Sequence, residues 1–304
     1  MTIDDQGIMF DLNTYLAERI ERINAALGSI LKTSEPPDRL LEAMTYSLMA
    51  GGKRFRSVLC VAAAEAFGGK LADVLPAACA LEMVHTYSLI HDDLPAMDDD
   101  AMRRGQPTCH KAFDEATAIL AGDALLTLAF QTLSSVEYSN AQQAVKWLNV
   151  IQLISQAAGY CGMIQGQMQD MGSEGSRLTL NELKSMHRLK TGALIEASMR
   201  CGAELVGVNS SQIKQLESYA RHIGLAFQVT DDILNVEGDP AVMGKAAGTD
   251  KLRHKSTYPS LLGLEKSKAF AENLTANALQ ALESFDQKAD PLRAIATYIV
   301  DRKK

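Results

Sequence analysis

The sequence predicts an all-α protein, a helical bundle forming a single domain over residues 1–304. Apolar residues recur at helical spacing along most of the chain, and the period-two alternation that marks strands is nearly absent. Hydrophobic residues make up 47% of the chain but aromatic residues only 6%, so the core must consist mainly of Leu, Ala, Val, Ile and Met. Length alone allows one large domain or two ordinary ones. No linker, low-complexity tract or repeat divides the chain, so one domain is the economical interpretation.

Ten helices are predicted along the chain, and the breaks between them contain residues that disfavour a helix. The predicted helices span residues 9–32, 38–50, 55–67, 72–94, 111–135, 141–170, 179–207, 210–237, 258–284 and 290–302. Proline cannot continue a helix, and glycine commonly ends one. The residues of this kind are Pro36 and Pro37, Gly68 and Gly69, Pro95, Gly172, and Gly238 with Pro240.

Three polar segments are predicted to lie outside the helices. They span residues 95–109, 171–178 and 238–256. The third mixes glycine with charged residues over a length that functional loops often have. We expect it to form a mobile flap, and an ordinary solvated loop is the alternative.

Charge and cysteine content exclude several classes of protein. A net charge of -7 argues against a general nucleic-acid binder, and the short basic groups suit a small anionic ligand better. Five cysteines without a C-x-x-C pair indicate neither a disulfide framework nor a zinc site, so a reducing cytoplasm is expected. The first 25 residues lack the apolar run of a secretory signal. No segment approaches ~18 uncharged apolar residues, so no membrane span is expected.

An acidic cluster follows the helix predicted at 72–94. The stretch SLIHDDLPAMDDDAMRRG, residues 88–105, contains five aspartates, at positions 92, 93, 98, 99 and 100. Pro95 ends the helix, so two carboxylates lie at its C-terminus, where the helix dipole disfavours them by about 0.3–1 kcal/mol per charge. Arg103 and Arg104 supply part of the compensation. Oxygen ligands in this number suit Mg²⁺ better than Zn²⁺, and a solvated acidic loop is the alternative.

Two polar stripes on otherwise apolar helices indicate the same kind of site. The first stripe leads into the acidic cluster and consists of Glu82, His85, Ser88 or Leu89, and Asp92. The second lies in GLAFQVTDDILNVEGD, residues 224–239, and consists of Gln228, Asp231 or Asp232, and Asn235. Unpaired carboxylates are costly to bury, so both stripes should face cations. Two such helices can clamp Mg²⁺ between them, and a diphosphate would complete the coordination.

Basic residues suited to a diphosphate stand in further segments. In GGKRFR, a glycine pair at a helix start precedes Lys53, Arg54 and Arg56, and backbone N–H groups there favour an anion. This segment is not a Walker loop, because the pattern G-x-x-x-x-G-K-[ST] is missing. The other candidates are Lys190 with Thr191 and Gly192, Lys245, and Lys255. Any one of these lysines alone would more often be ordinary surface charge.

Five motifs of the chain resemble those of the trans-isoprenyl diphosphate synthases, most closely the bacterial farnesyl diphosphate synthases. They are GGKRFR, HDDLPAMDDD with the RRG that follows, LKTGALI, FQVTDDIL and GKAAGTDKLRHKSTYP, between about residues 40 and 262. The resemblance implies an all-α bundle of the isoprenoid synthase type around a deep central cavity, usually a homodimer. It also implies that the two aspartate motifs face each other across the mouth of the cavity.

The same resemblance implies a role for each matching residue. The implied metal ligands are Asp92, Asp93, Asp98, Asp231 and Asp232, with Asp99 close by, for three Mg²⁺ ions that Mn²⁺ could replace. The allylic diphosphate is held by Arg103, Lys190 and Lys245, and isopentenyl diphosphate by Gly52, Lys53, Arg56, His85 and Arg104. Beside Lys190, the residues lining the nascent allylic cation are Thr191 and Gln228. Lys255 closes with the flap, and Gln167 and Asp170 face the cavity.

The implied activity is head-to-tail prenyl transfer. Dimethylallyl or geranyl diphosphate condenses with isopentenyl diphosphate to give farnesyl diphosphate. Mg²⁺ and basic side chains stabilise the departing diphosphate, and the isopentenyl double bond attacks the allylic cation. The released diphosphate then takes the proton. The alternatives are a geranylgeranyl or geranyl diphosphate synthase on the same scaffold, and a non-catalytic subunit that binds prenyl diphosphates.

Product length and two departures from the family pattern complete the prediction. Tyr87, five residues before Asp92 and next to Ser88, matches the position where a bulky residue floors the elongation pocket. Together with the inserted Pro95 and Ala96, this implies that growth stops at farnesyl diphosphate. Asn235 stands where the second motif usually ends in Asp, which implies a weaker contact there. Ser57 replaces a common Pro, a change expected to be mild and structural.

Overall fold

Helices form nearly all of the structure, a computed structural model that describes residues 10–32, 38–237 and 255–302. In chain order they are α1 (Leu12–Ile30), α2 (Arg39–Leu48), α3 (Phe55–Glu65), α4 (Leu71–Asp92), α5 (Cys109–Ala112), α6 (Glu115–Ser134), α7 (Ala141–Ala158), α8 (Met163–Gly172), α9 (Leu180–His187), α10 (Ala193–Val206), α11 (Ser210–Glu237), α14 (Tyr258–Leu262), α15 (Leu264–Ala281) and α16 (Asp290–Asp301). A π-helical turn, η1 (Arg188–Gly192), and a 3-10 turn, η2 (Gln287–Ala289), join some of them. The prediction of an all-α fold is confirmed.

The short strands β1 (Met102–Arg103) and β2 (Gln106–Pro107) pair antiparallel within the segment predicted to be non-helical after α4. The predicted flap at 238–256 lies outside the described residues apart from its last two positions. Lys245 also lies outside them.

Three predicted helices are interrupted in the structure. The helix predicted at 141–170 is broken between α7 and α8, where a Cβ on Gly162 would lie 2.1 Å from the carbonyl oxygen of Ala157. The helix predicted at 179–207 contains η1, and Gly263, at a φ of +82°, separates α14 from α15. The predictions were wrong at these points because the segments on both sides of each break keep helical periodicity.

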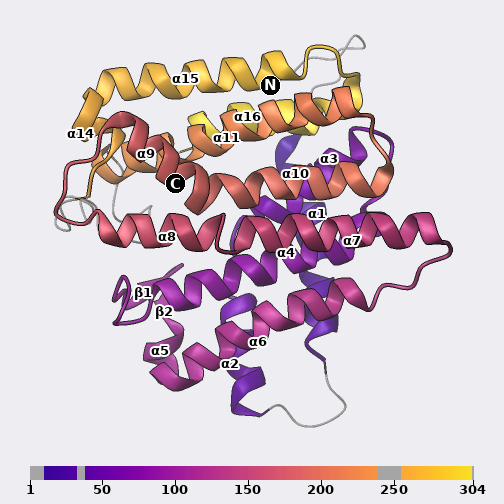
Figure 1. Cartoon of the computed structure of the whole chain (residues 1–304), viewed down its shortest axis with the longest axis horizontal. Helices are drawn as coiled ribbons and strands as arrows, with labels where there is room; N and C mark the ends of the chain where they lie inside the picture. The colour runs from indigo at the N-terminus through magenta and orange to yellow at the C-terminus, as the bar shows by residue number, and fades with distance from the viewer. Residues whose placement is uncertain (1–9, 33–37, 238–254, 303–304) are drawn as a thin grey trace.

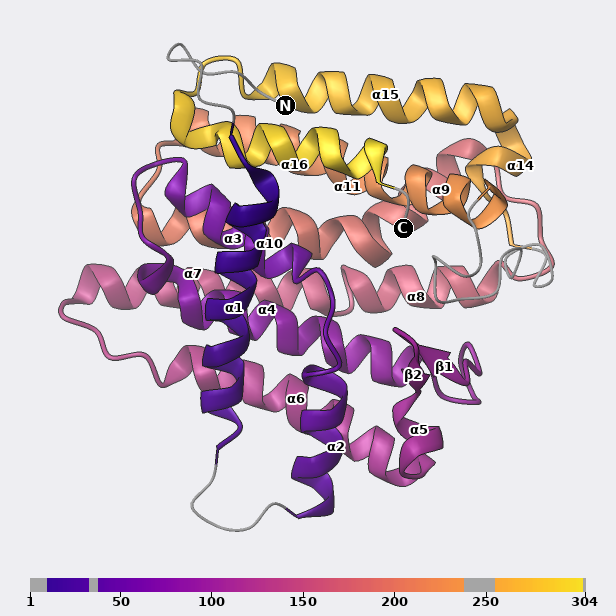
Figure 2. The same cartoon turned by 180° about the vertical axis from the view of Figure 1, so that it is seen from behind.

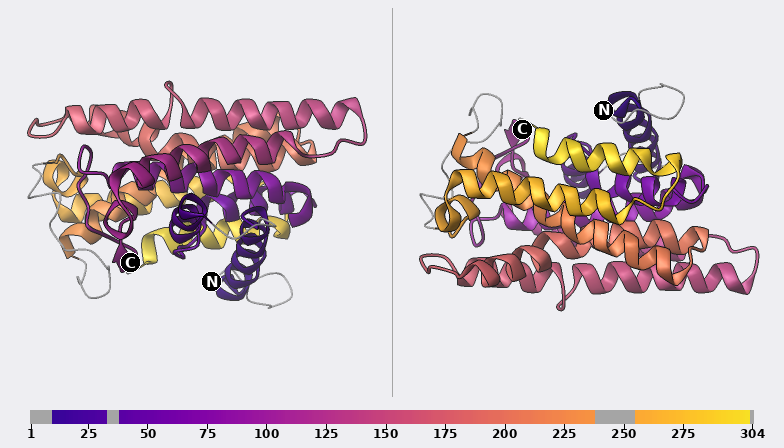
Figure 3. Two further views of the ribbon diagram at one scale, coloured as in Figure 1. Left: turned by 90° about the horizontal axis from the view of Figure 1, so that it is seen from below. Right: turned by 90° about the horizontal axis from the view of Figure 1, so that it is seen from above.

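Helix α4 runs through the middle of the bundle. It packs along α6, α3 and α10, as Figure 1 shows, and it is buried along most of its length. On the back of the molecule, α1 and α2 run steeply across the other helices (Figure 2). Helices α7 and α8 follow one another along one outer face (Figure 3). The C-terminal end of α4 therefore reaches one end of the bundle, where the acidic cluster begins.

Small residues allow α3, α4 and α10 to approach closely. On α4, Ala77, Ala78 and Ala80 are fully buried. On α10, Gly202 lies directly against α3, since a Cβ there would stand 2.1 Å from the carbonyl oxygen of Cys60. The low aromatic content of the chain thus accompanies a core in which helix backbones nearly touch.

We expect Gly202→Ala to lower the free energy of unfolding by about 1–3 kcal/mol, because the added methyl group overpacks this backbone contact. Gly28→Ala is the matched control, since Gly28 lies on α1 with nothing within 4 Å of an added Cβ. Alanine there should stabilise the helix by up to about 1 kcal/mol. Urea unfolding of both variants checks the expectation, and equal unfolding free energies would contradict the close α3–α10 contact.

Within the part of the chain that the structure describes, one helix, α6, is long and apolar enough to cross a membrane. Its mean hydropathy is 1.4. Asp123 interrupts its apolar run, which is why no long uncharged segment stands out in the sequence. The helix packs along α4 and α2, and helices within bundles pass the same test, so this is weak evidence for a span. About one third of its apolar window, 33%, is buried, and Ile119 and Leu120 remain exposed.

Candidate active site

The acidic cluster forms a turn that folds back on the C-terminus of α4. The backbone N–H of Asp98 donates to the carbonyl oxygen of Asp92 at 2.8 Å, and that of Asp99 donates to Leu94 at 3.0 Å. Asp99 takes a φ of +48° to close the turn. These bonds satisfy carbonyl groups that the end of a helix leaves without partners. They also bring the first and second groups of aspartates in the motif together.

Arg103 neutralises one aspartate of this cluster. Its Nε donates to both carboxylate oxygens of Asp93, at 2.8 and 2.7 Å, and Asp93 is buried. The guanidinium also lies 3.6 Å from Asp100. The residues Arg104 and Gly105, at φ of +53° and +76°, turn the chain between β1 and β2. This turn directs the two arginines to different partners, because Arg104 donates to the carbonyl oxygen of Gly51.

Asp92 carries an unfavourable charge in this environment. Desolvation raises its pKa to about 6, and the negative charges of Asp98 and Asp93 act in the same direction. The positive charges of Lys190 and Arg103 oppose the shift without cancelling it. A cation bound beside Asp92 would stabilise the ionised carboxylate.

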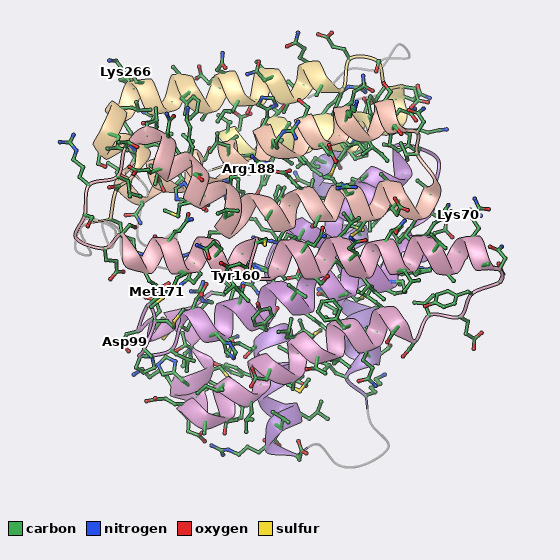
Figure 4. All side chains as sticks on the ribbon, in the orientation of Figure 1. Lys70, Asp99, Tyr160, Met171, Arg188 and Lys266 are labelled. Atoms are coloured by element: carbon green, nitrogen blue, oxygen red, sulfur yellow. The ribbon has the colours of Figure 1, made fainter. Side chains whose placement is uncertain are left out.

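A cavity of about 460 Å³ opens next to Asp92, between α4, α8 and η1. Its lining comprises Arg56, His85, Tyr87, Ser88, Leu89, His91, Asp92, Met97, Met163, Ile164, Gln167, Met168, Met171, Lys190 and Thr191. Figure 4 shows Met171 and Asp99 at this end of the bundle and Lys70 at the opposite end. A lining that combines charged groups with methionines would suit a ligand with an ionic head and an apolar tail.

Asp170 holds two of the predicted lysines together. One of its oxygens accepts hydrogen bonds from Lys190 at 2.7 Å and from Lys255 at 2.9 Å. Lys255 also lies 3.6 Å from Asp98. Although burial alone would raise the pKa of Asp170, the two lysines hold it below its usual value. The structure therefore places Lys190 and Lys255 next to the acidic cluster.

The π-helical turn η1 positions Lys190 and Thr191 against α8. Gly166 of α8 makes this possible, because a Cβ there would lie 2.1 Å from the backbone nitrogen of Lys190. Such single turns of π-helix often occur at functional sites. The adjacent Gln167 is buried, and neither its Oε1 nor its Nε2 has a partner among the described residues.

A short chain of hydrogen bonds connects η1 to the second aspartate motif on α11. The hydroxyl of Thr191 donates to Oε1 of Gln228 at 2.9 Å, and Nε2 of Gln228 lies 3.4 Å from Asp231. Asp231 also pairs with Arg302, whose guanidinium lies 4.1 Å from the centre of the Phe227 ring. The structure thus joins residues far apart in sequence in one network.

The neighbouring Asp232 is engaged elsewhere. It is buried and accepts a hydrogen bond at 2.9 Å from the backbone N–H of Tyr258, the first residue of α14. Adjacent residues on a helix point about 100° apart, so only one of the two aspartates joins the network of Gln228. Asn235 lies one turn further along α11.

The glycine pair of GGKRFR lets Arg104 lie against the backbone of the loop before α3. Gly51 and Gly52 have φ of +83° and +122°, and a Cβ on Gly52 would lie 2.6 Å from the Arg104 guanidinium carbon. Lys53 is exposed, with its ammonium 5.7 Å from the centre of the Tyr298 ring. Glycine at position 52 is therefore required by its backbone angle, and the absence of a Cβ there leaves room for the arginine.

Arg56 and His85 line the cavity beside this loop. Desolvation lowers the pKa of Arg56 to about 10, and its Nε has no partner among the described residues. Desolvation, reinforced by the charges of Arg56 and Arg104, lowers the pKa of His85 well below its usual value. His85 is therefore neutral near pH 7, and an anion would satisfy the arginines.

Arg54 and Glu82 have structural roles that their sequence positions did not reveal. Arg54 is buried and donates to Asn24 at 2.9 Å, to Glu82 at 2.9 Å and to the carbonyl oxygen of Leu48 at 2.7 Å. These bonds stabilise its left-handed φ of 48° at the start of α3. Ser57 donates to the carbonyl oxygen of Ala78 at 2.7 Å. The substitution of Ser for Pro thus adds a contact between α3 and α4.

Arg302 is a site residue that the sequence pattern does not predict. It follows α16 at the far end of the chain from the first motif, and nothing in its local pattern links it to Asp231. Only the packing of α16 beside α11 brings the two together.

His187, the last residue of α9, makes folding stability depend on pH. Desolvation lowers its pKa to about 4 from 6.5, and its Nδ1 lies 3.3 Å from the Tyr258 hydroxyl. The unfolded chain therefore binds this proton first as the pH falls from 6.5, and stability is lost at up to about 1.4 kcal/mol per pH unit.

We expect the unfolding free energy of His187→Gln to depend less steeply on pH between about pH 6.5 and 4, because up to one proton fewer is taken up on unfolding. Urea unfolding across that range measures it. Identical slopes in the two proteins would contradict a neutral, desolvated imidazole.

Comparisons with known proteins agree with this arrangement. Residues 37–295 match the family model described as Polyprenyl synthetase. The chain is 49% identical over 283 residues to a farnesyl diphosphate synthase from Micrococcus luteus, covering 93% of this chain and 96% of the relative. It is 47% identical over 298 residues to a heterodimeric geranylgeranyl pyrophosphate synthase large subunit 1 from Arabidopsis thaliana, covering 97% and 80%.

A solved structure is similar over nearly the whole chain. The FPP/GFPP synthase from Zymomonas mobilis is 39% identical, with a TM-score of 0.83 and coverage of 95% of this chain and 98% of that one. Family match, sequence identity and shared fold all lead to one assignment. The chain belongs to the polyprenyl synthetase family of trans-prenyltransferases.

Proposed function

We propose that this prenyltransferase is a farnesyl diphosphate synthase, which condenses dimethylallyl and then geranyl diphosphate with isopentenyl diphosphate. The observation that carries the proposal is a single cavity lined by Asp92 and Lys190, by Arg56 and His85, and by Tyr87. These residues supply an allylic diphosphate site, a second anion site and a bulky boundary to the apolar space.

The donor set fits Mg²⁺, the cofactor we propose. All candidate ligands offer carboxylate oxygens, and no three acidic, His or Cys groups in the described ranges converge as a ready metal site. Mg²⁺ is commonly held by one or two carboxylates and completed by water and substrate phosphates. Asp92, Asp98 and Asp231 would hold the ions, three in number by family resemblance, and Mn²⁺ is a possible substitute. When bound, Mg²⁺ neutralises charge that develops on the leaving diphosphate.

Asp93 and Asp232 are less favoured as ligands than the sequence implied. Asp93 is buried and pairs with Arg103, and Asp232 is buried and accepts the backbone N–H of Tyr258, whereas Asp231 stays partly exposed although it pairs with Arg302. We propose that Asp93 orients Arg103 toward the allylic diphosphate and that Asp232 supports the start of α14.

The chain's own cations would hold the allylic substrate. Lys190 and Arg103 lie beside the acidic cluster, and Lys255 shares Asp170 with Lys190. As the bond between the allylic carbon and the diphosphate oxygen breaks, its electron pair stays with the diphosphate, where these cations stabilise it. Lys245 retains the same role as a prediction.

Thr191 and Gln228 would stabilise the carbon side of that bond. Because Thr191 donates its proton to Gln228, its own oxygen lone pairs remain available to the developing positive charge. The π electrons of isopentenyl diphosphate then form the new carbon–carbon bond. A proton leaves the resulting cation, and the released diphosphate accepts it.

Isopentenyl diphosphate would bind to Lys53, Arg56 and Arg104 around the loop that contains Gly52. Neutral His85 can donate or accept a hydrogen bond there without adding charge. The Nε of Arg56, which has no partner within the part of the chain that the structure describes, gives this anion a specific donor. The two anions are thereby held on different arginines.

We also propose a homodimer that works in a reducing cytoplasm. Large apolar side chains are exposed on α6 and α7, and Tyr160, which is 80% exposed, lies between α7 and α8 (Figure 4). Those on the two helices are Ile119, Leu120, Val145 and Leu148. A second copy of the chain would cover such side chains. All five cysteines are free, four of them buried, which suits a reducing compartment.

A geranylgeranyl synthase is the second candidate, because relatives with that name are as similar as those named farnesyl synthase. A geranyl synthase is a further alternative on the same scaffold. Incubation of the purified chain with dimethylallyl and isopentenyl diphosphates and Mg²⁺, followed by mass analysis, tests the proposal. We expect farnesyl diphosphate as the main product. Geranylgeranyl or geranyl diphosphate in its place would overturn the assignment of product length.

A further inference from the structure

The hairpin formed by β1 and β2 carries the two arginines that we assign to different substrates. It lies next to α5 at one end of the bundle (Figure 2). Arg103 pairs with Gln106 in its register, so Arg104 and Gly105 form the turn. The position of Arg104 therefore depends on how both strands of the hairpin are held.

The two strands are anchored by different contacts. On β1, Nε of Arg103 donates to both carboxylate oxygens of the buried Asp93, at 2.8 and 2.7 Å. On β2, the carbonyl oxygen of Pro107 accepts a hydrogen bond at 2.7 Å from the hydroxyl of Tyr46, a residue of α2. The turn between the strands is thus held from both sides.

A small cavity lies between the hairpin and the helices behind it. It has a volume of about 40 Å³, and its lining includes Tyr46 and Ser47 of α2, Thr86 of α4 and Arg104 of the turn. The hydroxyl oxygens of Ser47 and Thr86 are buried and have no partner among the described residues. Since close packing is interrupted here, the hydrogen bonds of the hairpin carry more of its positioning.

The ring of Tyr46 is itself held in place. Its centre lies 5.7 Å from that of Phe113 at an interplanar angle of 77°, an edge-to-face contact that restricts its orientation. Helix α2 also leads into the loop that contains Gly51, whose carbonyl oxygen accepts a hydrogen bond from Arg104. One helix therefore sets the position of β2 and of the backbone acceptor of Arg104.

We infer that Tyr46 is a positioning residue, which acts through β2 to hold Arg104 in place for isopentenyl diphosphate. This inference rests on the proposed function. A diphosphate bound to Arg104 would compete with the Gly51 carbonyl for the guanidinium, because charged acceptors make the stronger hydrogen bonds. The bond from Tyr46 to the backbone of β2 is not part of that competition. Arg103 keeps its own salt bridge, so binding of the allylic diphosphate should not depend on Tyr46.

We expect Tyr46→Phe to raise the KM for isopentenyl diphosphate about three- to tenfold, the scale of one lost hydrogen bond. The KM for geranyl diphosphate and kcat should keep their wild-type values. Phenylalanine retains the ring contact with Phe113. KM does not depend on the amount of folded enzyme, so a loss of stability alone would not produce this result. Tyr138→Phe is the matched control, since Tyr138 is 41% exposed between α6 and α7 and should leave both KM values unchanged.

Arg104→Lys tests whether Tyr46 acts through the arginine. Lysine keeps the charge but lacks the planar guanidinium, so this variant alone should raise the KM for isopentenyl diphosphate. In the Arg104→Lys background, Tyr46→Phe should raise this KM by a smaller factor than in the wild type, because residues that act as a unit are not additive. Fully additive effects would contradict a role through Arg104.

The KM values of Tyr46→Phe decide the inference. An unchanged KM for isopentenyl diphosphate, or an equal rise for both substrates, would overturn it while the proposed function stands. If the wild type does not condense the two substrates, the proposed function fails and the inference fails with it.

Discussion

Asparagine in place of Asp92 is expected to lower kcat for condensation by at least about 10²–10³-fold, the scale seen when one preorganised electrostatic contact is lost. The carboxylate lies at the end of α4 beside Lys190 and Asp98, where we propose Mg²⁺ binds. Asparagine keeps the shape and removes the charge. Release of diphosphate at saturating substrate and Mg²⁺ measures the loss, and Glu283→Gln, on an exposed residue after α15, is the matched control.

The same variant should not lose stability. The folded-state pKa of Asp92 is raised to about 6 from 3.8, so its contribution is favourable below the unfolded value and is lost as pH rises through about 6. At about pH 8 and without metal, the ionised carboxylate is therefore a cost that asparagine removes. Urea unfolding should show equal or greater stability. An active Asp92→Asn variant would contradict the metal site, and an unfolded one would contradict the pKa argument.

Tyr87→Ala is expected to change the main product from farnesyl to geranylgeranyl or longer diphosphates. The buried phenol lines the cavity, and its removal opens space for another isoprene unit. A pocket boundary of this kind commonly discriminates by about tenfold or more, so the product ratio should change by at least that factor. Mass analysis of products gives the ratio directly.

Tyr87→Phe is the matched control for this substitution. It keeps the ring and its edge contact with His91, so it should still make farnesyl diphosphate. If both variants make farnesyl diphosphate, Tyr87 is not the boundary. If both make longer products, the hydroxyl group rather than the bulk of the ring sets the length.

The sequence predicts the helices well because their apolar periodicity is local. It does not predict η1, although the break matters for the site: Lys190 and Thr191 sit on a turn that is π-helical where α8 approaches at Gly166. That close approach joins segments more than twenty residues apart, and helical periodicity carries no information about it.

The site residues show the same difference between local patterns, which the sequence predicts, and tertiary contacts, which it does not. Spacing groups Gln228 with Asp231 or Asp232 equally well, and only the position of Tyr258 N–H shows that Asp232 is engaged elsewhere. Asp170 appears in the sequence as one cavity-facing acid, but its bridge between Lys190 and Lys255 depends on three separate segments. Long-range pairs of this kind arise from tertiary packing, which local patterns do not encode.

Among the basic residues, the sequence predicts one anion-binding side chain that the structure places elsewhere. The sequence places Arg54 among the anion-binding residues, whereas the structure buries it against Glu82 with no exposed guanidinium. Lys53 and Arg56, its neighbours, remain near the loop that we propose binds isopentenyl diphosphate. One helical turn cannot direct all three side chains into the same site.

Diphosphate release by the wild-type chain tests the central claim most directly. The assay contains geranyl diphosphate, isopentenyl diphosphate and Mg²⁺, with three controls that each omit one of these components, the last by adding a chelator. The account predicts rapid release only when all three are present, because both substrates and the metal take part in one condensation. No release from the complete mixture, or equal release without isopentenyl diphosphate, would contradict it.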